Sequence, residues 1–81
     1  MKIELLNGQF NSKDALELIT EMMNLKIKYH ENRIVNSNNE EDIKFRELKI
    51  KNIQHQLYEI RNNMRGKNCD VTLNSVVNLE F

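Results

Sequence analysis

The chain has 81 residues, and its 12 basic and 12 acidic side chains cancel to a formal charge of zero. A chain of this length supports one domain, so residues 1–81 are predicted to form a single domain. Balanced charge argues against a protein built mainly to hold nucleic acid or an anionic membrane. The single cysteine, Cys69, allows no disulfide within the chain, and with the lack of a recognisable signal peptide it favours a cytoplasmic location.

The first ten residues are predicted to form a short strand and a turn. Ile3 and Leu5 alternate with polar neighbours, which is the period of a strand with one apolar face. Asn7 and Gly8 follow, a pair that is typical of tight turns. The strand is therefore expected to end near this pair, within residues 1–10.

A first helix is predicted over residues 12–35. Asn11 can cap it, and the carboxylate of Asp14 can reach back toward the cap from the third helical position. An acid in the first turn also suits the positive end of the helix dipole. The stretch contains neither glycine nor proline, so the helix is expected to run unbroken for roughly 36 Å.

A second helix is predicted over residues 38–65. Ser37 and Glu40 match the S-x-x-E spacing of a capping box. Acidic residues gather at the start and basic residues at the end, and Gly66 suits the position just past the last turn. An apolar residue recurs every seven positions along this helix, at Ile43, Ile50, Leu57 and Met64.

In the tail, residues 69–81, every second residue from Val71 onward is apolar except Ser75: Val71, Leu73, Ser75, Val77, Leu79 and Phe81. A period of two is typical of a strand. Its natural partner is the N-terminal strand, because both lie at the open end of the two helices. A disordered tail and a tail that exchanges between chains stay open as alternatives, since an isolated two-stranded ribbon is marginal in water.

These elements predict a mainly α fold. The connection between the helices is only a few residues long, and helices joined by so short a loop usually pack antiparallel. The expected fold class is an antiparallel helical hairpin with short β-like terminal segments. Folding the chain back at Asn36 pairs the apolar residues in layers along a narrow seam of coiled-coil type. The seam consists of Leu16, Ile19, Met23, Ile27 and Ile34 on the first helix and Ile43, Ile50, Ile53, Leu57 and Ile60 on the second.

The first helix carries more apolar surface than this seam uses. Its apolar residues span about 200° of the helix circumference, whereas those of the second span about 100°. A second copy of the chain is the simplest cover, and two hairpins joined about a two-fold axis would form a four-helix bundle. Two alternatives stay open: the terminal strands fold over this stripe, or a different protein covers it. The predicted homodimer interface consists of Ala15, Leu18, Met22, Leu25 and Tyr29.

Residues with catalytic or metal-binding chemistry are sparse. His30 is expected in the seam beside Arg46 and Glu47, and a structural hydrogen bond to Glu47 is favoured over a role in proton transfer. His55 has no His or Cys three or four residues away with which to share a metal ion. Phosphate- and dinucleotide-binding motifs are absent. No catalytic residue, metal ligand or cofactor is therefore assigned, and the protein is predicted not to be an enzyme.

The outer face of the second helix is the candidate surface for a target. Its basic and aromatic residues stand among acidic ones, a mixture typical of a solvated helix face. The function that follows is a non-enzymatic protein–protein interaction, assembly or regulatory module that acts as a homodimer. An accessory nucleic-acid-binding regulator is the alternative, no membrane partner is expected, and an open sheet edge could accept a strand from a target protein. The candidate partner surface comprises Lys44, Phe45, Leu48, Lys51 and Tyr58.

Overall fold

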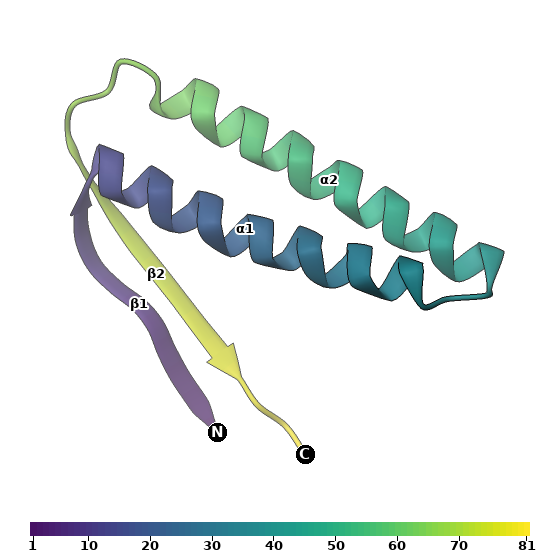
Figure 1. Cartoon of the computed structure of the whole chain (residues 1–81). Coiled ribbons are helices and arrows are strands. Elements are labelled where there is room, and N and C mark those ends of the chain that lie inside the picture. The colour runs from purple at the N-terminus through teal and green to yellow at the C-terminus, as the bar shows by residue number, and fades with distance from the viewer.

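The computed structural model describes all 81 residues, in the order β1–α1–α2–β2 (Figure 1). The two helices contain 24 and 25 residues, so the fold is mainly helical with a β segment at each end, as predicted. The elements are β1 (Lys2–Asn11), α1 (Ser12–Val35), α2 (Glu40–Met64) and β2 (Asp70–Asn78).

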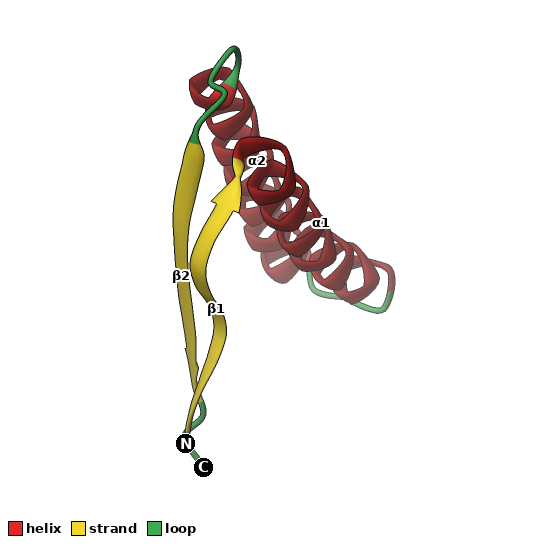
Figure 2. Cartoon of the chain, turned by 90° about the vertical axis from the view of Figure 1, so that its left-hand side faces the viewer, coloured by secondary structure: helices red, strands yellow, loops and turns green.

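Helices α1 and α2 lie side by side as an antiparallel hairpin (Figures 1 and 2). Every residue assigned to the seam between them is buried or half-buried. Ile53 and Leu57 of α2 are the most deeply buried of these. The narrow apolar arc of α2 is thereby largely satisfied within its own chain, since a single neighbouring helix is enough to cover it.

Both helices begin at an asparagine cap. At α1, the side chain of Asn11 accepts a hydrogen bond from the Asp14 backbone N–H (2.8 Å) and donates one to the Asp14 carboxylate (3.0 Å). At α2 the predicted Ser37 cap is wrong. The side chain of Asn39 accepts instead from the backbone N–H groups of Glu41 and Asp42, at 2.9 and 3.2 Å. An amide oxygen at position 39 meets the first free N–H groups directly, so α2 begins two residues later than predicted.

The terminal segments form a two-stranded antiparallel sheet. The tail therefore pairs with the N-terminal strand, which was one of the three outcomes left open by the sequence. The turn predicted at Asn7–Gly8 is wrong, because β1 continues to Asn11 and pairs with β2 along its length. Gly8 lies opposite Leu73 with a φ of 146°. Pairing with a strand distant in the sequence has outweighed the local turn preference.

A register shift between Glu4 and Leu6 makes Leu5 an extra residue on β1. Such a bulge lets a strand re-aim its side chains. Ile3 and Leu6 oppose Val77 and Ser75, and these two β2 residues lie on the same face because they are two positions apart. The bulge therefore keeps Ile3 and Leu6 on one apolar face of the ribbon, although they are three positions apart.

The molecule is a flat slab rather than a compact globule. It measures 46 × 33 × 13 Å, and the ribbon diverges from the helices instead of lying along them (Figures 1 and 2). Its radius of gyration is 15.3 Å, whereas a compact chain of this length has about 12 Å. Domains normally enclose a core between two packed layers, and this chain supplies little more than one. The four buried residues are Ala15, His30, Ile53 and Leu57.

Neither α1 nor α2 combines the length with the hydrophobicity that a membrane-spanning helix requires.

Candidate partner-binding surfaces

The structure divides the predicted homodimer stripe of α1 into a covered part and a free part. Ala15 is fully buried within the chain, so it is not available to a partner in this conformation. Leu18 and Met22 are half-buried. Leu25 and Tyr29 leave 68% and 53% of their surface exposed. The free apolar surface of α1 is therefore centred on its second half.

The ribbon accounts for part of this division. Met22 lines an apolar groove of ≈ 280 Å³ in which α1 faces the middle of β1 and β2. The ribbon thus lies beside the first part of α1 and diverges from the helix axis beyond it (Figure 1). The groove is lined by Leu6, Ile19, Met22, Met23, Ile60, Leu73, Asn74 and Ser75.

The apolar face of the ribbon is likewise covered at one end only. Leu6, Phe10, Val71 and Leu73 are half-buried near the start of α1. Toward the free end of the ribbon, larger parts of the apolar side chains are exposed. Sequence reasoning missed Leu6 and Leu73 as surface-forming residues; the adjacent pair Leu5–Leu6, which breaks the alternation, was the available signal for a bulge. The exposed apolar residues of the free end are Met1, Ile3, Leu5, Val76, Val77, Leu79 and Phe81.

A polar cluster crosses the hairpin near its closed end. His30 is buried on α1, and the Arg46 guanidinium donates a hydrogen bond to its Nδ1 atom at 3.1 Å. Arg46 also pairs with Asp42 through Nε at 3.2 Å. The predicted partner Glu47 is wrong, because Glu47 is exposed whereas Arg46 is half-buried against α1.

The charges around His30 oppose its protonation. Burial, followed by the cations of Arg46, Lys26 and Lys49, lowers the pKa of His30 below its ordinary value. Because a guanidinium can only donate, the Nδ1 atom accepts and the proton of the neutral ring is on Nε2. Tyr29 packs edge-on against this ring with 5.4 Å between ring centroids, and Arg33 lies 5.6 Å from the centroid of the Tyr29 ring. The cluster thus holds a neutral, oriented imidazole between the helices.

The predicted partner surface on α2 is exposed to solvent. Phe45, Leu48 and Tyr58 each leave more than half of their surface free, and Lys44 and Lys51 are exposed. The ammonium of Lys49 lies 5.2 Å from the centroid of the Phe45 ring. These side chains stand among charges, so the outer face of α2 is a mixed apolar and charged surface.

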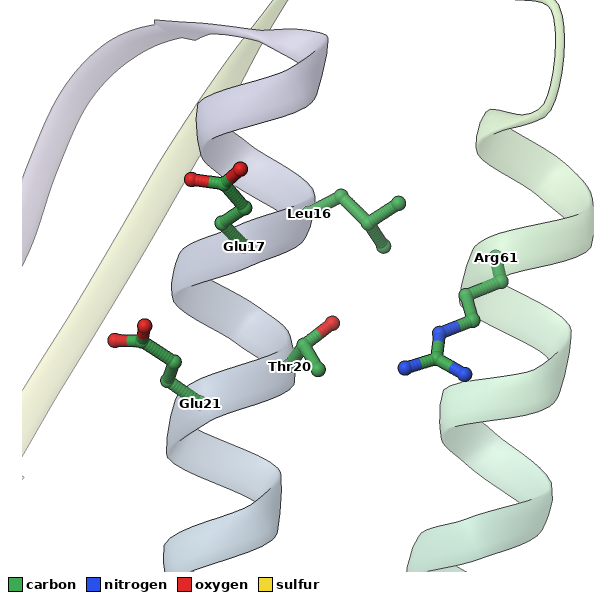
Figure 3. A pocket seen from close by; sticks show the side chains of 5 residues that line it. All are labelled: Leu16, Glu17, Thr20, Glu21 and Arg61. Carbon is green, nitrogen blue, oxygen red and sulfur yellow. The ribbon is translucent and has the colours of Figure 1, made fainter.

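A shallow hollow of ≈ 310 Å³ near the open end of the hairpin is lined by residues of both helices (Figure 3). Leu16 and Thr20 of α1 point toward α2, and Arg61 of α2 points back toward them. The carboxylates of Glu17 and Glu21 point away from Arg61. The hollow therefore brings together no nucleophile with a neighbouring base, which is the arrangement that covalent catalysis needs.

No group of three or more His, Cys, Asp and Glu side chains is placed to hold a metal ion. Cys69 is an exposed free thiol in the segment between α2 and β2. Comparison of the chain with protein-family models, with curated proteins and with solved structures gives no match.

Proposed function

We propose that the chain is a non-enzymatic interaction module that works as a homodimer, in which a second copy covers the apolar surface left free on α1 and on the ribbon. One observation carries the proposal. The chain exposes 6723 Å² at a mass of 9.7 kDa, whereas a compact monomer of this mass exposes about 5,100 Å².

The excess, about 1,600 Å² per chain, matches what an obligate homodimer buries. Two copies that each lost this area would share an interface of about 3,200 Å², inside the range of permanent dimers. Leu25 and Tyr29 supply large apolar side chains for such a contact. Joining two hairpins through α1 gives a four-helix bundle, which adds the second layer that a single chain lacks.

In this dimer, the outer face of α2 points away from the two-fold contact and stays free for a target. Phe45, Leu48 and Tyr58 are the side chains that would anchor a second protein there. We propose that the dimer holds or regulates that protein rather than transforming a substrate.

The test compares two exposed leucines by light scattering. We expect Leu25→Glu to weaken association about tenfold or more, because the carboxylate would lose water at the contact. Leu48→Glu makes the same chemical change on the outer face of α2 and should leave the dimer intact. A Leu25→Glu chain with the mass of a dimer would move the interface away from α1, and a wild-type chain that stays monomeric at high concentration would end the proposal.

A further inference from the structure

The two outer edges of the ribbon differ in how they are protected. The sheet has two strands only, so β1 and β2 each have one unpaired edge. β1 carries the charges of Lys2 and Glu4 and a bulge at Leu5, and charges and bulges block pairing at sheet edges. In β2, residues 71–78 contain no charge, no proline and no bulge. The edge of β2 is therefore free to pair with another strand.

The backbone groups on that edge follow from the hydrogen bonds to β1. Met1 and Leu79 exchange both of their backbone hydrogen bonds, at 2.7 and 3.0 Å. In an antiparallel pair, residues that exchange both bonds alternate with residues whose N–H and C=O point outward. Counting back along β2, the outward groups belong to Thr72, Asn74, Val76 and Asn78.

These outward residues can pair with the same set of residues in a second copy of the chain. If two β2 strands meet antiparallel at Asn74, Thr72 lies opposite Val76 of the second copy and Asp70 lies opposite Asn78. No like charges face each other, and the outward groups of each strand meet outward groups of the other. The register also explains Val76, an apolar residue with 58% of its surface exposed on a face that is otherwise polar. In the pair, it gains a β-branched neighbour in Thr72.

The same register extends the apolar face of the ribbon. Directly opposite residues share a face, so Val77 lies beside Val71 of the second copy, and Leu73 lies beside Ser75. Val77 is exposed near the free end of its own ribbon, whereas Val71 is half-buried near the start of α1. The pairing therefore sets the bare end of one ribbon next to the covered end of the other.

We infer that the β2 edges of two copies pair antiparallel about a two-fold axis at Asn74, which joins the ribbons into a four-stranded sheet β1–β2–β2–β1. The inference rests on the proposed self-association and names the strand contact within it. The occupant of the edge is a second copy because the register at Asn74 satisfies both the hydrogen-bonding groups and the apolar face of this one sequence.

Cysteine cross-linking tests the register. In a full-length Cys69→Ser background, Asn74→Cys places two thiols opposite each other at the axis, and mild oxidation should give a covalent dimer on a denaturing gel. Thr72→Cys is the matched control on the same face, because its two copies would be offset by about 13 Å along the strands, beyond the ~7 Å that a disulfide spans. We expect several-fold more covalent dimer from Asn74→Cys, and equal yields from both variants would overturn the pairing.

A charge test gives a second readout without oxidation. Asn74→Lys sets two like charges opposite each other and should weaken self-association measured by light scattering. Asn7→Lys adds the same charge to the cross-strand neighbour on β1 and should have little effect. An Asn74→Lys chain that associates like the wild type would also overturn the pairing.

The outcomes separate this inference from the proposed function. If Asn74→Cys fails to cross-link while the wild-type chain has the mass of a dimer, the strand pairing is wrong but the proposed homodimer is retained. The free edge of β2 would then be a site for a strand of another protein. If the wild-type chain is a monomer, both fall.

Discussion

The helical hairpin and the terminal ribbon differ in how completely each covers its own apolar side chains. In the hairpin, the apolar arc of α2 is matched by α1, and Ile53 and Leu57 are buried in the seam. In the ribbon, only the end that adjoins α1 is covered, and Ile3, Val77 and Leu79 each leave more than a third of their surface exposed. Two helices of similar length can cover each other along their whole length, whereas a diverging ribbon meets its helix only near the connection.

The difference shows which part of the chain leaves its apolar side chains uncovered. The hairpin keeps most of its contacts when the chain is alone, because its seam is formed by residues close in space within one unit. The ribbon has one apolar face and no layer over its free end, and two strands alone are marginal in water. Stability should therefore be lost first from the ribbon and last from the centre of the seam.

The largest effect is expected from opening the seam. Leu57→Ala removes a buried side chain between the helices and should lower the free energy of unfolding by about 2–5 kcal/mol, measured by urea denaturation at fixed protein concentration. Leu48→Ala is the matched change at an exposed leucine of α2 and should stay within about 0.5 kcal/mol. Equal losses from the two variants would mean that the seam is not the core of the hairpin.

A smaller loss of stability is expected from adding a side chain to the ribbon at Gly8. The φ of 146° is one that L side chains rarely adopt, and a Cβ there would meet no atom within 4 Å. Gly8→Ala should therefore cost about 1–2 kcal/mol through backbone strain alone, and Gln9→Ala should cost much less. Amide hydrogen exchange should quicken in β1 and β2 and stay unchanged at the centre of α1 and α2. Faster exchange throughout both helices would show that the ribbon and the hairpin unfold as one unit.

The smallest effect is expected from the polar cluster at the closed end of the hairpin. Burial and the charge of Arg46 lower the pKa of His30 in the folded chain, while the unfolded value is about 6.5. The unfolded state then binds more protons, so the free energy of unfolding should fall as the pH drops through about 6.5 and level off below the folded-state pKa.

Thermal unfolding between pH 7.5 and 5.5 measures this dependence. His30→Gln keeps an acceptor for Arg46 and should flatten this pH dependence. A slope that survives in His30→Gln would assign the titration to another group.

Much of the local structure follows from patterns that involve neighbouring residues only. Asn11 and Asp14 mark the start of α1: the predicted cap bond from the Asp14 backbone N–H to Asn11 forms, and the Asp14 carboxylate reaches back to the Asn11 side-chain amide. The seven-residue recurrence from Ile43 to Met64 predicts the face of α2 that packs against α1. Such features are readable because a helix fixes the relation between residues three and four positions apart.

The candidate partner surfaces could be predicted from the sequence only in part. The surplus of apolar residues on α1 is a property of the sequence, and so is the alternation in the tail. The sequence does not show which of these residues are covered. Ala15 and Leu25 belong to the same stripe, yet Ala15 is buried and Leu25 is largely exposed. Their burial depends on how α1, α2 and the ribbon are placed relative to one another, and no local pattern encodes that placement.

The sequence by itself determined two long helices, a short connection and one apolar stripe more than a hairpin can use, because helical periodicity and capping act over a few residues. Only the tertiary structure decided that β1 runs through Asn7–Gly8 to meet β2, that Arg46 rather than Glu47 bonds to His30, and that the edge of β2 stays open. The physical reason is the same in each case: contacts between residues far apart in the chain outweigh local preferences, and they depend on how whole elements are placed.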